Sequence, residues 1–99
     1  MNNKKINIIS LENSNSQPEE RLMELLNAVE TAILFYGRQH QMIGNPYWWF
    51  SGQLGYKSKN FLYGIFQKRE HHKLTTDAVS KVYQITKDEQ LKQVWLRFL

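Results

Sequence analysis

The sequence predicts an all-α fold of about five helices in a single domain. Apolar residues recur at three- and four-residue spacing along the longest patterned stretch, which is the period of an amphipathic helix. Helix-start signals, in which Ser, Asn or Thr is followed by Pro or Glu, occur at several points. No stretch shows the strict alternation of a strand, and 99 residues leave room for one hydrophobic core.

The first helix is expected to begin at Ser16 and to end near Gly37–Met42. The sequence Ser16-Gln17-Pro18-Glu19 fits a capping box, in which the hydroxyl and the carboxylate satisfy free amide donors. The residues expected to face inward are Leu22, Leu25, Leu26, Val29, Ala32, Ile33 and Tyr36. The opposite face carries Glu19, Glu20, Glu24 and Glu30. Residues 1–15 are rich in Asn and Ser, and we expect a flexible N-terminal arm before a domain at 16–99.

Two short helices joined by a glycine turn should follow. Asn45-Pro46 supplies an N-cap and a proline at the first helical position, so a helix over 47–54 is expected, and Gly55 should end it. Ser58 is expected to cap a second helix over 59–67. Ser51 lies four residues before the turn, where a small side chain lets the two helices approach. This order is the core of a helix-turn-helix domain of the lambda-repressor-like kind.

Two further helices are expected after a basic loop at 68–74. Thr75 or Thr76 should cap the first, with Ala78, Val79, Val82, Tyr83 and Ile85 inward. Thr86-Lys87-Asp88-Glu89 fits another capping box. It should open the last helix, with Leu91, Val94, Trp95 and Phe98 inward.

Positive charge is concentrated around the second short helix. Residues 57–73 contain five basic residues and one acid, a net charge of +4, whereas the rest of the chain carries eight basic and eight acidic residues. The whole formal excess of +4 therefore lies in this basic window. Local basicity of this kind indicates a polyanionic partner. The alternative is a solvated basic loop without a partner.

The second short helix has the residue types of a DNA-recognition helix. Asn and Gln can bond adenine bidentately, and Lys can reach guanine acceptors. Gly64 is expected to permit close approach to DNA, and Gly52 to relieve crowding beside Ser51. The residues expected at the DNA are Lys57, Ser58, Lys59, Asn60, Tyr63 and Gln67. Those expected on or near phosphate are Lys68, Arg69, His71, His72 and Lys73.

The stretch LGYKSKNFLYGIFQKREHHKLTTDAVSKVYQITKD resembles the DNA-binding domain of CII-type transcriptional regulators of temperate phages. The shared marks are a glycine turn, a helix with a Leu-xxx-Leu-like pair (here Leu62 and Phe66), and His72-Lys73-Leu74-Thr75 opening the next helix. The resemblance implies a phage or prophage regulator that binds operator double-stranded DNA as a symmetric oligomer. The chain departs from the family's pattern at Tyr63-Gly64-Ile65 and at Gln67-Lys68.

A run of four aromatic residues, Tyr47-Trp48-Trp49-Phe50, keeps a second function class open. Side chains of four consecutive helical residues point in every direction, so we expect two in the core and the others against a neighbouring helix or a partner. The rival hypothesis is a phage protein-interaction module, an inhibitor or antirepressor, that binds a protein partner through Trp48 and Trp49. Leu96 and Leu99 also lie off the inward stripe, and a homodimer or tetramer is expected.

Other function classes find little support in the residues. The chain has no cysteine, which excludes disulfides and thiolate sites and fits the cytoplasm. No apolar run has the length of a membrane span. His71-His72 with His40 lacks the companion ligands of a metal site, and no nucleophile or carboxylate pair has a catalytic spacing. We therefore expect neither an enzyme, nor a metal, nor a cofactor.

Overall fold

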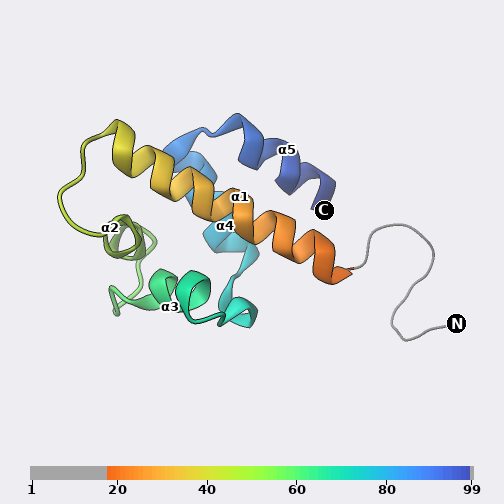
Figure 1. The fold of residues 1–99 in the computed structure, drawn as a ribbon, viewed down its shortest axis with the longest axis horizontal. Helices are drawn as coiled ribbons and strands as arrows, with labels where there is room; N and C mark the ends of the chain where they lie inside the picture. Colours follow the sequence, from red (N-terminus) through yellow and green to blue (C-terminus); the bar gives the residue numbers. More distant parts are fainter. Residues whose placement is uncertain (1–17, 99) are drawn as a thin grey trace, which may run out of the picture.

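The computed structural model describes residues 18–98, and this part of the chain is helical without any strand. The expected flexible arm, the Ser16 end of the first capping box and Leu99 lie outside the described residues. The elements are α1 (Pro18–Gln39), α2 (Pro46–Gln53), α3 (Phe61–Gln67), the short 3-10 helix η1 (His71–Lys73), α4 (Thr76–Thr86) and α5 (Glu89–Phe98) (Figure 1). The all-α prediction is confirmed for this part of the chain. None of its helices has the length and hydropathy needed to cross a membrane.

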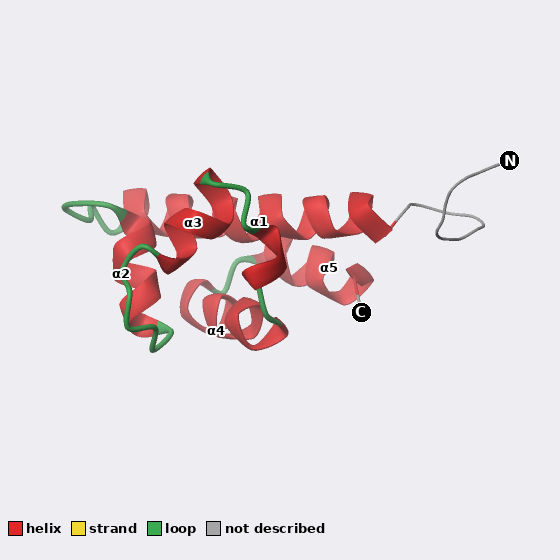
Figure 2. Ribbon diagram, turned by 90° about the horizontal axis from the view of Figure 1, so that it is seen from below, coloured by secondary structure: helices red, strands yellow, loops and turns green. Residues whose placement is uncertain are grey.

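The long helix α1 is the scaffold on which the other elements pack. It contacts α4 and α5 on one side and α2 near its C-terminal end, while α3 packs on α2 (Figure 1). Viewed from below, α2 lies at one end of the molecule and the C-terminus of α5 at the other (Figure 2). The core residues are Leu25, Leu26, Ala28, Val29, Ala32, Ile33, Tyr47, Phe50, Leu54, Leu62, Ile65, Ala78, Val79, Val82, Leu91 and Val94.

The inward stripe of α1 is as the spacing predicts. Five of its seven residues are buried, and Leu22 and Tyr36 are half-buried against the core. The prediction for Glu30 was wrong, because this side chain lies half-buried beside α2 and α3 instead of on the solvent face. Gly37 brings α2 close to α1, since a Cβ at this position would lie 2.7 Å from Pro46 Cγ.

Two predicted helix starts are confirmed. Asn45 caps α2, and its side chain accepts a hydrogen bond from Tyr47 N at 2.9 Å. Thr75 caps α4, and its hydroxyl accepts from Ala78 N at 3.1 Å. In both helices the short polar side chain satisfies an amide of the first turn that has no partner within the helix.

Two other starts are shifted along the chain. Ser58 does not cap α3; its hydroxyl accepts from Asn60 N at 3.1 Å, and the helix begins only at Phe61. Asp88 takes the place expected of Thr86 at the start of α5, because Asp88 Oδ1 accepts from Leu91 N at 2.9 Å. Thr86 is the last residue of α4, and Lys87, with φ of +54°, reverses the chain between the two helices.

The aromatic run of α2 divides as expected. Tyr47 and Phe50 are buried, whereas Trp48 and Trp49 are 41% and 39% exposed. Trp49 stacks on Tyr36 of α1, with ring centroids 5.8 Å apart. In α5, Leu91 and Val94 are buried, and Trp95 and Phe98 pack against the core from half-buried positions.

Candidate nucleic-acid interface

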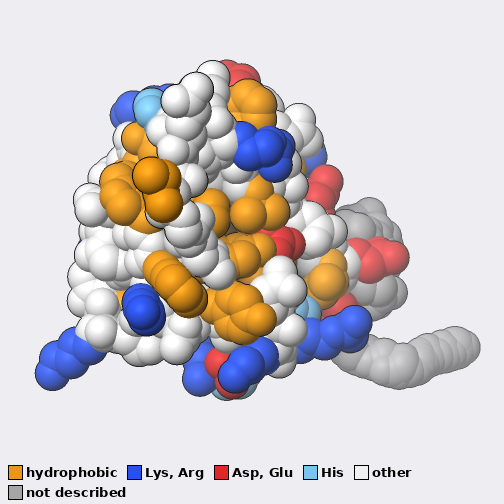
Figure 3. All heavy atoms as spheres, turned by 60° about the vertical axis from the view of Figure 1, so that its left-hand side comes forward, with side chains coloured by type: hydrophobic (Ala, Val, Ile, Leu, Met, Phe, Trp, Pro, Cys, Tyr) orange, Lys and Arg blue, Asp and Glu red, His pale blue; other side chains and the backbone are white. Residues whose placement is uncertain are grey.

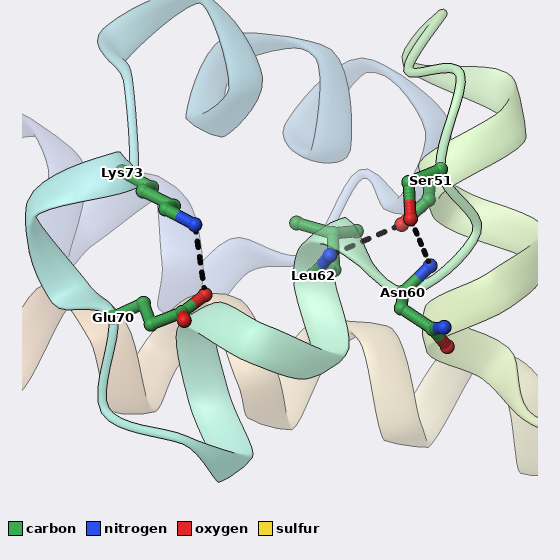
Figure 4. Close-up of polar contacts among 6 residues, drawn as sticks. Ser51, Asn60, Leu62, Glu70 and Lys73 are labelled. Carbon is green, nitrogen blue, oxygen red and sulfur yellow. Dashed lines mark hydrogen bonds and ion pairs between the residues drawn. The ribbon is translucent and has the colours of Figure 1, made fainter.

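The turn between α2 and α3 is built around Gly55 and Ser51. Gly55 has a φ of +89°, a conformation that glycine adopts without strain. Ser51 is fully buried, and its hydroxyl accepts a hydrogen bond from Leu62 N at 3.2 Å, which ties the start of α3 to α2 (Figure 4). Tyr56 follows Gly55, and its ring stacks on that of Phe61, with ring centroids 3.8 Å apart. The expected role of Gly52 was wrong, because it is exposed with open space around its Cα.

The basic residues of the window are exposed on both sides of α3. Lys57 and Lys59 lie in the turn before the helix, and Lys68, Arg69 and Lys73 lie after it. Figure 3 shows Lys and Arg side chains gathered along the lower edge of the molecule, the edge where Figure 1 places α3 and its flanking segments. The Lys59 ammonium also lies 4.3 Å from the centre of the Trp48 ring, so the positive surface adjoins the exposed aromatic surface of α2.

A shallow hollow of about 360 Å³ lies along α3. Its lining is Ser58, Asn60, Phe61, Tyr63, Gly64, Lys68, Glu70 and Lys73. Five of the eleven predicted DNA-contact residues therefore meet around one depression, although they come from the turn before the helix, from the helix and from the segment after it. The lining offers ammonium, amide, hydroxyl and phenol donors, the groups that bind phosphate and base edges.

Gln67 is engaged elsewhere, contrary to its expected place on the DNA-facing side. Its Nε2 donates to Glu30 Oε2 and to the Tyr47 hydroxyl, each at 3.1 Å. Tyr47 in turn donates its hydroxyl proton to the Glu30 carboxylate. Burial, and then the hydrogen bond to Glu30, raise the pKa of Tyr47 to about 12. These three side chains join α1, α2 and α3, so the amide of Gln67 serves the packing of the helices.

Gly64 is also used inside the protein. A Cβ at this position would lie 2.5 Å from Glu70 Oε1, so the carboxylate already occupies the space expected to admit DNA. Arg69 has a φ of +59°, which turns the chain back, and the amides of Lys68 and Glu70 both donate to Gly64 O. Sequence reasoning missed Glu70, although it is the single acid of the basic window.

His71 and His72 lie in η1, outside the lining of the hollow. His71 is half-buried and His72 is exposed. Among residues 18–98, no three His, Asp or Glu side chains come together as a metal site would require.

Comparison of the chain with protein-family models, with curated proteins and with solved structures finds no match. A function is therefore inferred from the chemistry of the basic surface around α3. Its five exposed cations and the mixed donors of the hollow suit an extended anion.

Proposed function

We propose that the protein is a sequence-specific DNA-binding transcriptional regulator, with α2, the Gly55 turn and α3 acting as a lambda-repressor-like helix-turn-helix. The hollow carries this proposal, because it gathers Asn60, Tyr63, Lys68 and Lys73 within the window that holds the protein's whole net charge. Phage or prophage origin is proposed from the resemblance to CII-type regulators. Such a regulator acts in the cytoplasm as a homodimer or tetramer, so that two α3 helices reach successive major grooves.

Within this proposal, the side chains around α3 divide into two roles. Asn60 is exposed at the start of the helix and reads a base edge together with Tyr63. Lys68 and Lys73 bind phosphate beside the hollow, and Lys57, Lys59, Arg69, His71 and His72 extend the contact with the DNA backbone. Ser58 lies on the rim and donates to phosphate. Gln67 takes no part, because its amide is bonded to Glu30 and Tyr47.

The salt dependence of DNA binding tests the proposal. The wild-type protein is titrated with duplex DNA at increasing salt, alongside a Lys68→Ala, Arg69→Ala, Lys73→Ala triple variant. Removing one lysine or arginine from a phosphate should reduce the slope of log K against log salt by about 0.9, equally for all sequences. A Lys81→Ala, Lys87→Ala, Lys92→Ala variant has the same net charge and is the control. The proposal fails if the wild type binds no duplex at low salt, or if both triple variants lower the slope equally.

The exposed aromatic surface of α2 favours a second candidate, a protein-interaction module. Trp48 and Trp49 are about two-fifths exposed, Ile43 before α2 is fully exposed, and Phe35 of α1 is 47% exposed. Figure 3 shows hydrophobic side chains gathered on this end of the molecule. Exposed apolar surface of this kind is typical of protein contacts. In this alternative the basic window keeps the protein soluble and Trp48 anchors the partner.

A further inference from the structure

Glu70 places a negative charge inside the surface proposed to bind DNA. Its carboxylate lies in the hollow over Gly64, and Lys73 Nζ is 3.1 Å from Glu70 Oε1 (Figure 4). The two side chains are 37% and 44% exposed, so solvent and ligands reach the pair. Arg69 has a left-handed backbone conformation, and the amides of Lys68 and Glu70 donate to Gly64 O. Together they turn the chain back after α3, which places Glu70 over Gly64.

We propose that Glu70 is a built-in competitor of DNA phosphate, an inference that rests on the proposed function. A carboxylate and a phosphate oxygen accept the same charge-assisted hydrogen bond from an ammonium group. Lys73 is therefore held by Glu70 until a phosphate displaces the carboxylate. Binding to any duplex is weakened as a result, because Lys73 reaches phosphate only when its ion pair with Glu70 is broken.

The pair has no comparable role in stabilising the fold. Glu70 and Lys73 form an exposed ion pair at i and i+3, a kind that contributes little to stability. The space over Gly64 could be filled equally by an uncharged side chain of the same shape. The position of the charge matters. At physiological salt the Debye length is about 8 Å, so the Glu70 carboxylate repels a phosphate bound in the hollow.

The test compares Glu70→Gln with the wild type on a scrambled duplex. Glutamine keeps the size of the side chain and removes its charge. Glu70→Gln should bind about fivefold more tightly with an unchanged salt slope, because Lys73 no longer has to leave a carboxylate to reach the same phosphate. Asp77→Asn is the matched control: it also removes one acid from an exposed ion pair, with Lys81 at 3.1 Å, but on α4 and outside the basic window. It should change affinity less than twofold, as a rim charge screened by salt does.

A second background tests the competition itself. In a Lys73→Gln protein, adding Glu70→Gln should tighten binding much less than it does in the wild type, because no ammonium remains at this position for the carboxylate to hold. The same gain in affinity there would overturn the inference, as would equal effects of Glu70→Gln and Asp77→Asn. If the wild type binds DNA and Glu70→Gln binds no better, the inference alone fails; if the wild type binds no duplex, the proposed function fails with it. Circular dichroism confirms the fold of each variant, and Glu70→Ser replaces Glu70→Gln if the latter does not fold.

Discussion

At two helical glycines, the neighbouring group determines how an added side chain changes the free energy of unfolding. At Gly64 an added Cβ meets only the flexible end of Glu70, whereas at Gly37 it meets the Pro46 ring at 2.7 Å. Gly64→Ala should therefore raise the free energy of unfolding, by up to about 1 kcal/mol, since alanine favours the helix. Gly37→Ala should lower it by about 1–3 kcal/mol through overpacking. Urea unfolding measures both, and a destabilisation at Gly64 as large as that at Gly37 would show that the Glu70 side chain cannot move aside.

The Tyr47 hydroxyl gives a second prediction at the residue scale. Its pKa is raised from 10.0 to about 12, first by burial and then by the hydrogen bond to Glu30. The folded state therefore keeps a proton that the unfolded state loses, so this contribution to stability is complete below pH 10 and disappears as the pH rises through 12. Tyrosinate absorbance should show a late ionisation near pH 12 that Tyr47→Phe removes. Glu30→Gln should shift it only in part, because burial is the larger cause. Disappearance of an ionisation near pH 10 in Tyr47→Phe would show that the hydroxyl is freely solvated.

The α2–α3 unit depends on two residues with separable roles. Ser51→Ala removes the acceptor of the buried Leu62 amide and should cost about 1–3 kcal/mol. Gly55→Val forces a β-branched residue to a φ of +89° and should cost on the order of 1–2 kcal/mol, although nothing crowds that position. Gly52→Ala is the control, since its surroundings are open and its φ is ordinary. Thermal and urea unfolding of the three variants measures these costs. A Gly55→Val protein as stable as Gly52→Ala would contradict the turn.

The elements also show which predictions a sequence can support. Asn45 and Thr75 were correctly placed because a cap bonds amides two or three residues away, so the signal is local. The starts of α3 and α5 were misplaced because each segment has two polar residues within one turn that could act as the N-cap. At α5, the left-handed backbone of Lys87 ends α4 and leaves Asp88 as the cap. Gln67 was misplaced for another reason. Its partner Glu30 lies 37 residues away, and no spacing within the α3 segment indicates that contact.

At the scale of the molecule, the candidate interface was predicted better as a region than as a set of residues. Composition alone located the charge, and five of the predicted residues do line one hollow. The return of the chain at Arg69 could not be predicted, because arginine rarely adopts a positive φ. The turn at Arg69 places Glu70 over Gly64. The space that was expected to admit DNA is therefore occupied by a carboxylate.

Asn60 and Trp48 separate the two function classes for the whole protein. Both are exposed; Asn60 follows Lys59 in the chain, and the Lys59 ammonium lies 4.3 Å from the centre of the Trp48 ring. If α3 reads bases, Asn60→Ala should weaken operator binding by about 1–3 kcal/mol and leave a scrambled duplex almost unaffected. Trp48→Ala should then change the affinity for both duplexes equally, because it alters the position of Lys59. If the protein is an interaction module, Trp48→Ala should abolish partner binding and Asn60→Ala should change nothing. The measurement is a pair of titrations, with an operator selected from random duplexes and with its scrambled version.

Gln67→Ala is the structural control, since it should lower stability without changing the ratio of the two affinities. An Asn60→Ala protein that loses equal affinity for both duplexes would remove base reading from α3, because a contact that does not distinguish sequences lies on the phosphate backbone.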